Sequence, residues 1–253
     1  MSGSALAILT AAGSGVRLGC EGPKALVEVG GVPMLVRAAN GLAAAGISGI
    51  VVTAPPDQVE RFASLFQGDA TGSGVAIEVV AGSDASRQAS VARGLAALPR
   101  LAARIGARLD EFTPVLVHDA ARCLAPVDAI RRVVDAVESG QEAVIPAVPV
   151  TDTLKEVGAP IEGPDARPVV STPDRSTLVA VQTPQGFAWE RLRLAHESAA
   201  SRASSEATAA TDDAGLVEAL GGRVVVVEGS HLSLKITTAV DLALAELLLA
   251  RAE

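Results

Sequence analysis

The chain has 253 residues, of which 49% are apolar and only 2% aromatic, and its formal net charge is −8 at pH 7. This length suits one large α/β domain with a core of Val, Leu, Ile and Ala, and the acidic balance argues against general nucleic-acid binding, which needs a basic surface. No apolar run reaches the roughly 18 residues of a membrane span, and the N-terminus lacks the pattern of a signal peptide, so we expect a cytoplasmic protein that binds neither nucleic acid nor membrane.

Strand-like and helix-like segments alternate over the first 148 residues. Short β-rich runs predict strands, and amphipathic segments between them predict helices. In chain order we expect a strand at 5–10, a helix at 33–45, a strand at 50–53, a helix at 57–66, a strand at 76–80, a helix at 87–98, a strand at 115–118, a helix at 127–137 and a strand at 143–148. Such alternation is typical of an α/β fold with a Rossmann-like, doubly wound, mostly parallel sheet.

The alternation breaks between Pro149 and Gln185. Gly, Pro and Asp separate short β-like runs there, which indicates a hairpin-like excursion from the sheet, and an irregular insertion of this size is usually functional. The β-like runs are 153–157, 169–171 and 178–182, and after them we expect helices at 189–200 and 212–220, a strand at 224–228 and a closing helix at 238–250. Thr238 and Asp241 are spaced as a possible capping pair for that helix. We predict one domain, 1–253, with a protruding β-arm at 149–185.

Residues 9–24, LTAAGSGVRLGCEGPK, contain the end of the first expected strand and the loop that follows it. Small side chains there allow a phosphate or a base to approach the backbone closely. The Walker A pattern does not fit, since Lys24 follows Pro and precedes Ala, and the dinucleotide fingerprint does not fit, since Leu18 replaces its third glycine. The remaining pattern places Arg17 and Lys24 where two positive charges can flank a triphosphate, as nucleotidyl transfer requires. It resembles the signature loop of sugar-nucleotide-type nucleotidyltransferases.

Four later segments narrow this resemblance: VHDAAR at 117–122, AVPVTDTLK at 147–155, PDRSTLVAVQTPQGF at 173–187 and LKIT at 234–237. Together with the first loop they closely resemble the 2-C-methyl-D-erythritol 4-phosphate cytidylyltransferases of the non-mevalonate isoprenoid pathway. The resemblance implies transfer of CMP from CTP to this polyol phosphate, with release of pyrophosphate and formation of 4-diphosphocytidyl-2-C-methyl-D-erythritol. The attacking phosphate monoester has a second pKa of about 6, so it is ionised at neutral pH and needs no general base.

The resemblance also implies roles for individual residues. Arg17 and Lys24 would stabilise the transition state at the α-phosphate. The residues expected to bind CTP are Ala11, Ala12, Gly13, Gly82, Asp84 and Ser90. The residues expected to bind the polyol phosphate are Asp119, Arg122, Thr153, Arg175, Thr183, Thr211 and Lys235. Mg²⁺ is expected as a cofactor that is bound together with CTP, and no residue is assigned to it as a ligand.

A homodimer is the last implication of the resemblance. The arm at 149–185 would interlock with a second subunit and carry Arg175 into that subunit's active site. Two alternatives remain: a ribitol-5-phosphate cytidylyltransferase, which shares the first loop and much of the HDAAR region, and a catalytically silent nucleotide-binding module. The cation pairs Arg17–Lys24 and Arg175–Lys235 argue against the silent module, because a simple binder would not need both.

Overall fold

A mixed β-sheet forms the centre of the computed structural model, which describes residues 5–13, 18, 22–67, 74–161 and 166–251. Within these residues the sheet order is β10-β7-β11-β6-β1-β4-β5, and β12 also pairs with β7. The strands are β1 (Leu6–Thr10), β4 (Gly49–Ala54), β5 (Ala76–Ala81), β6 (Pro114–Asp119), β7 (Ala143–Pro149), β10 (Val179–Val181), β11 (Gln185–Ala188) and β12 (Val224–Glu228). A short hairpin lies outside this sheet; its strands, β2 (Glu28–Val29) and β3 (Val32–Pro33), have two residues each.

Most pairs of the central sheet are parallel. β1 lies between β4 and β6 and is parallel to both, β4 is parallel to β5, and β7 is parallel to β12. β11 is antiparallel to both β6 and β7, and β10 is antiparallel to β7. The predicted Rossmann-like, mostly parallel sheet is therefore confirmed, with an antiparallel strand inserted between β6 and β7.

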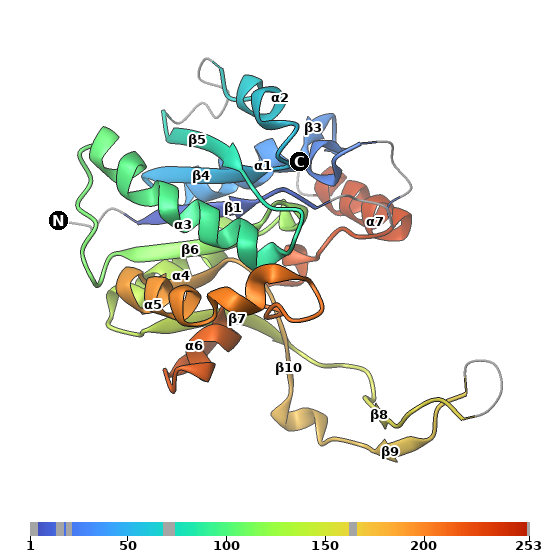
Figure 1. Ribbon diagram of the computed structural model, residues 1–253. Coiled ribbons are helices and arrows are strands. Elements are labelled where there is room, and N and C mark those ends of the chain that lie inside the picture. Colours follow the sequence, from blue (N-terminus) through green and yellow to red (C-terminus); the bar gives the residue numbers. More distant parts are fainter. Residues whose placement is uncertain (1–4, 14–17, 19–21, 68–73, 162–165, 252–253) are drawn as a thin grey trace.

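Helices cover both faces of the sheet (Figure 1). The α-helices are α1 (Met34–Ala44), α2 (Val59–Ser64), α3 (Arg87–Arg104), α4 (Val127–Glu138), α5 (Trp189–Ser198), α6 (Ala214–Ala219) and α7 (Ala239–Ala250). Side chains of α1 and α4 pack in one hydrophobic cluster, and those of α3, α5 and α6 pack in another. Alternate residues of β1 serve the two clusters, Leu9 facing the first and Ile8 the second, because successive side chains of a strand point to opposite faces.

Two elements differ from the sequence-based expectation. The helix predicted at 87–98 continues to Arg104 with Pro99 inside it. Leu101 and Ala102, beyond the proline, are buried in the core, and this packing outweighs the hydrogen bond that proline cannot donate. Strand β11 was not predicted, since its residues Gln185 and Gly186 have low strand propensity.

Helix α7 begins as its sequence predicted. Thr238 Oγ1 accepts a hydrogen bond from the Asp241 N–H, and the Asp241 carboxylate accepts one from the Thr238 N–H, which forms a capping box. A hydrogen bond from the Thr237 side chain contributes most to lowering the pKa of Asp241, to about 2. In the described part of the chain no helix has both the length and the apolar character that a bilayer crossing requires.

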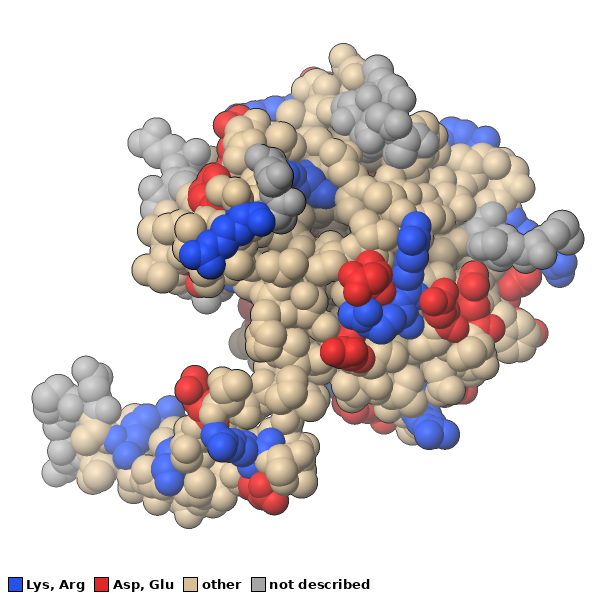
Figure 2. Space-filling model, turned by 180° about the vertical axis from the view of Figure 1, so that it is seen from behind, with Lys and Arg blue, Asp and Glu red and all other residues tan. Residues whose placement is uncertain are grey.

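A long arm leaves the sheet after β7 and returns at β10 (Figure 1). It carries the antiparallel pair β8 (Glu156–Val157) and β9 (Val169–Ser171) and a short 3₁₀ helix, η4 (Arg175–Thr177). Figure 2 shows the arm set apart from the body, with acidic and basic side chains along it. Its apolar side chains are also exposed, Val170 by 64% and Val169 by 58%. The arm therefore has little core of its own.

Gly94 and Gly41 provide a matched test of the packing between helix and sheet. A Cβ at Gly94 in α3 would lie 2.7 Å from Ile8 Cγ2, whereas a Cβ at Gly41 in α1 would have no neighbour closer than 3.8 Å. We expect Gly94→Ala to lower the free energy of unfolding by about 1–3 kcal/mol through overpacking. Gly41→Ala should raise it by up to about 1 kcal/mol, because alanine favours a helix. Urea unfolding of both variants checks this, and equal effects would contradict the close packing.

Candidate active site

A cavity of about 610 Å³ opens at the carboxyl ends of β1 and β6. The chain passes from β1 to β4 on one side, and β6 pairs with β1 on the other side, so the cavity lies where the winding direction of the sheet reverses. Open α/β sheets bind their ligands at such a switch point. We call this cavity the cleft. Among the described residues, its wall includes three cations, Lys24, Arg87 and Lys235. Three acidic residues line it as well: Asp84, Asp119 and Glu206.

The small residues after β1 form one part of the cleft wall. Ala11, Ala12 and Gly13 all line it. The Ala11 N–H donates to the Thr53 carbonyl over 3.0 Å, which fixes the start of this segment against β4. A Cβ at Gly13 would have none of the described residues within 4 Å, which leaves room on their side for a ligand.

The segment before α3 and the first turn of α3 form a second part of the wall, which includes Asp84 and Ser90. Ser90 is buried, and its hydroxyl accepts a hydrogen bond from the Ser83 N–H over 2.9 Å, so it holds the segment in shape. Gly82 does not line the cleft. A Cβ there would lie 2.9 Å from Ala12 Cβ and 3.0 Å from the Ala54 carbonyl oxygen, so glycine permits the two segments to approach.

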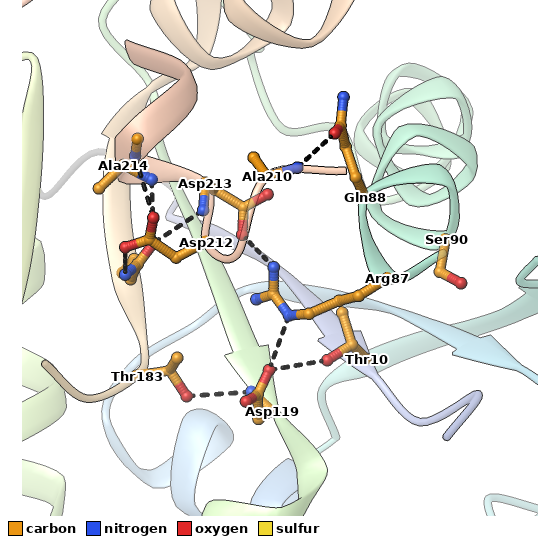
Figure 3. Close-up of polar contacts among 12 residues, drawn as sticks. Thr10, Arg87, Gln88, Ser90, Asp119, Thr183, Ala210, Asp212, Asp213 and Ala214 are labelled. Carbon is orange, nitrogen blue, oxygen red and sulfur yellow. Dashed lines mark hydrogen bonds and ion pairs between the residues drawn. The ribbon is translucent and has the colours of Figure 1, made fainter. Parts of the chain in front are cut away.

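Asp119 ends β6, and Figure 3 shows it joined to Thr10, Arg87 and Thr183. Its Oδ1 accepts from Arg87 Nε and from Thr10 Oγ1, each over 3.1 Å, and its Oδ2 pairs with Lys235 Nζ over 2.8 Å. Burial alone would raise the pKa of this carboxyl, but the charges of Arg87 and Lys235 outweigh burial and hold the pKa well below its usual range. Asp119 is therefore ionised at neutral pH and anchors two of the three cations of the wall.

The QTPQ segment at 182–185 lies behind the cleft wall, and all four of its residues are buried. The side-chain amide of Gln182 forms hydrogen bonds with both the N–H and the carbonyl of Ser230, at the start of the segment that leads to Lys235. Thr183 Oγ1 accepts a hydrogen bond from the Asp119 N–H over 3.0 Å. Gln185 Oε1 accepts hydrogen bonds from the N–H groups of residues 213 and 214. One short motif thus fixes three separate segments around the cleft.

The structure brings many of the residues predicted for the site together. Those that line the cleft are Ala11, Ala12, Gly13, Lys24, Asp84, Ser90, Asp119 and Lys235. Three others lie behind or beside the wall: Gly82, Thr183 and Arg122, whose Nη1 donates to the Ser233 carbonyl over 2.7 Å. Three do not line it: Thr153 and Arg175 are exposed on the arm, and Thr211 is exposed at the start of the segment before α6. Arg17 lies outside the described residues.

Sequence reasoning missed several residues of the wall. Arg87 contacts Asp119, and its Nη1 also pairs with Asp213 Oδ2 over 2.7 Å. Glu206 Oε1 accepts a hydrogen bond from the Arg87 N–H over 2.7 Å. A helix start was predicted at Arg87, but no local pattern shows that the partners of its side chain lie 32 and 126 residues further along the chain.

His118, directly before Asp119, is buried, and its Nδ1 lies 2.9 Å from Thr183 Oγ1. Burial disfavours the imidazolium and lowers the pKa of His118 from 6.5 to about 4. Between these two values the unfolded chain binds a proton that the folded chain does not, so stability falls as pH falls. We expect this histidine to remove about 2 kcal/mol from the free energy of unfolding between pH 7 and pH 5.

Urea unfolding at both pH values checks this expectation. In His118→Asn the free energy of unfolding should fall less between pH 7 and pH 5 than in the unmodified protein. His231→Asn, at an exposed position, should show the same fall as the unmodified protein. Equal pH dependence in His118→Asn and in the unmodified protein would contradict a buried, neutral His118.

Comparisons with known proteins agree with one another. The family model described as 2-C-methyl-D-erythritol 4-phosphate cytidylyltransferase matches residues 5–251. A protein of that name from Streptomyces avermitilis is 45% identical over 246 residues, which cover 97% of this chain and 91% of that protein. Its namesake from Streptomyces coelicolor is 46% identical, over 97% of this chain and 84% of that protein. The crystal structure of the protein of that name from Thermus thermophilus is 35% identical, with a TM-score of 0.69 over 98% of both chains.

Proposed function

The chain belongs to the 2-C-methyl-D-erythritol 4-phosphate cytidylyltransferase family, and we propose that the cleft is the place where CTP meets this polyol phosphate. The enzyme is a nucleotidyltransferase that transfers CMP and releases pyrophosphate. The observation that carries the assignment of the site is the gathering of Lys24, Arg87 and Lys235 at a switch point of the sheet. Asp119 pairs with two of these cations, and the Lys235 side chain stays partly exposed beside it, so the cleft can still offer positive charge to a polyanionic ligand.

The reaction needs charge neutralisation more than proton transfer. An oxygen of the polyol phosphate attacks the α-phosphorus of CTP, a new P–O bond forms, and the bond to pyrophosphate breaks. Negative charge on the non-bridging oxygens must be stabilised as this happens, and a fixed ammonium such as Lys24 can do so. No base is required, which agrees with a neutral, buried His118 beside the cleft.

Lys235 is our candidate for receiving the attacking phosphate. Its side chain is 44% exposed while its ammonium pairs with Asp119, so it is anchored at one side and accessible at the other. Thr183 was predicted to bind the substrate, but its hydroxyl is bonded to the Asp119 N–H and to His118. We therefore assign Thr183 a positioning role behind Asp119.

A divalent cation, with Mg²⁺ as our candidate, would enter with CTP. Among the described residues no group of three His, Cys, Asp or Glu side chains could form a protein cage for a metal. Both carboxylate oxygens of Asp119 are already bonded to cations. Mg²⁺ is commonly held by substrate phosphates and water with few protein ligands, and here it would reduce the charge of the triphosphate.

We also propose the homodimer through the arm at 149–185. An isolated two-stranded ribbon is marginally stable in water, and β8–β9 exposes apolar side chains that a second subunit could cover. Arg175 and Thr153 lie on this arm and outside the cleft lining of their own chain, so they could serve the cleft of a partner. The cytoplasmic location stays a prediction from the sequence.

Pyrophosphate release tests the function directly. With CTP and Mg²⁺, we expect a much higher kcat/KM for 2-C-methyl-D-erythritol 4-phosphate than for ribitol 5-phosphate. The family comparisons favour the first substrate. A preference for ribitol 5-phosphate would overturn the substrate assignment, and no turnover with either would support the silent nucleotide-binding module.

A further inference from the structure

Arg87 lies at the centre of the ion pairs of the cleft, although the chemistry of the reaction assigns it no task. It is the first residue of α3, and its side chain is 22% exposed. Its Nε donates to Asp119 Oδ1 over 3.1 Å and its Nη1 to Asp213 Oδ2 over 2.7 Å, so that one guanidinium joins two carboxylates (Figure 3). Arginine can do this because its donors form a planar fork.

Asp213 holds Arg87 from inside the protein. It is only 1% exposed, and its Oδ1 lies 2.9 Å from Nε2 of His196, a buried residue of α5. Its backbone N–H donates to Gln185 Oε1, which fixes its place before α6. Asp213 therefore cannot move toward the cleft without losing buried contacts, and Arg87 has a fixed support.

Asp119 connects Arg87 to Lys235 in the cleft wall. Arg87 and Thr10 hold its Oδ1, and its Oδ2 is left for Lys235 Nζ at 2.8 Å. The contacts thus run from His196 through Asp213, Arg87 and Asp119 to Lys235. Two cations and two carboxylates balance in this set. Without Arg87, Asp213 would lose its arginine partner and Asp119 would lose one of its two cations, so the wall would become more negative and would repel a phosphate.

We propose that Arg87 is a positioning residue of the transferase reaction, because it orients Asp119 so that the Lys235 ammonium is fixed where the attacking phosphate arrives. The inference rests on the proposed function of the cleft and goes beyond it, since Arg87 acts through Lys235. The competing interpretation is purely structural: Arg87 only ties α3 to the segment before α6. That interpretation predicts lower stability without a selective effect on one substrate.

Kinetics of Arg87→Gln and Arg87→Lys separate the two interpretations. Arg87→Gln should lower kcat/KM for the polyol phosphate by about 10- to 100-fold, the scale of one charge-assisted hydrogen bond. The Kd for Mg²⁺–CTP, measured by calorimetry, should change by less than about threefold, within the effect of a remote contact. Arg87→Lys keeps the charge, so its loss of kcat/KM for the polyol phosphate should be smaller than that of Arg87→Gln. It should still lose some activity, because a lysine cannot bridge both carboxylates. Arg100→Gln, the same change at an exposed position of α3, is the control and should retain full activity.

A double-mutant cycle with Lys235→Met tests the path of the effect. Relative to Lys235→Met alone, adding either substitution of Arg87 should decrease kcat/KM further by less than about threefold, because the group that Arg87 positions is already gone. Equal losses in both backgrounds, or equal losses for CTP and the polyol phosphate, would overturn the inference. Arg87→Lys keeps the test decisive if Arg87→Gln does not fold.

The cycle also distinguishes failure of the inference from failure of the proposed function. A strong defect in Lys235→Met without coupling to Arg87 would overturn the inference alone. Unchanged kinetics in Lys235→Met would overturn the proposed role of Lys235, and this inference with it.

Discussion

Replacement of Lys24 by alanine is expected to lower kcat at least about 100-fold and to leave the KM for CTP nearly unchanged, as for a contact made mainly in the transition state. Lys24 lines the cleft at the start of a short 3₁₀ helix, η2 (Lys24–Leu26). The backbone around it is fixed, since the Leu26 N–H donates to the Pro23 carbonyl and Ala25 is buried in the core. These contacts do not involve the Lys24 side chain, so we expect Lys24→Ala to keep the fold.

Steady-state and single-turnover kinetics check this expectation. Lys24→Arg keeps the charge but replaces a compact ammonium with a planar group, so it should recover only part of kcat. Arg61→Ala, on the exposed surface of α2, is the control and should behave like the unmodified enzyme. A rise in KM with kcat unchanged would instead make Lys24 a group that binds the ground state.

Mixed dimers are expected to recover activity from two inactive variants. Lys24→Ala damages the body of a subunit, whereas Arg175→Ala damages its arm. If each arm serves the cleft of the other subunit, a mixed dimer has one intact site and one site with both defects. Random exchange makes half of the dimers mixed, so about a quarter of the full activity should return, as the symmetry of a two-fold dimer requires.

A second mixture provides the control for this experiment. Lys24→Ala and Lys235→Met both damage the cleft lining of their own chain, so no arrangement of arms can restore either site. Differently tagged subunits, purified in two steps, show that mixed dimers form. Mixed dimers of Lys24→Ala and Arg175→Ala without activity would place Arg175 in the site of its own chain and contradict the exchange of arms.

The order and type of most elements follow from the sequence because they depend on local patterns. The apolar runs at β1, β4, β6 and β12 predicted strands, and Thr238 with Asp241 predicted the start of α7. Part of the cleft was also predictable. Glycine and alanine after β1, and a carboxylate at the end of β6, are signals that need no knowledge of distant contacts.

Contacts between distant segments were not predictable. β11 inserts between β6 and β7 because Gly186 lets the sheet approach α4, where a Cβ would lie 2.5 Å from Val133 Cγ1. The sequence pattern of a four-residue strand such as β11 cannot show that it packs this closely against α4. Pro99 inside α3 is a similar case, since only the packing of the next turn shows why the helix continues.

Residue patterns were enough to predict the α/β class, a candidate site at the strand ends and the family, and the comparisons confirm the class and the family. Which charged side chains meet is visible only in the folded chain. Arg87 lies between Asp119 and Asp213, and His196 contacts Asp213, because the start of α3, the end of β6, the residue before α6 and the last turn of α5 converge in space. An ion pair depends on the distance between two charges in space, whereas a sequence pattern reports only their separation along the chain.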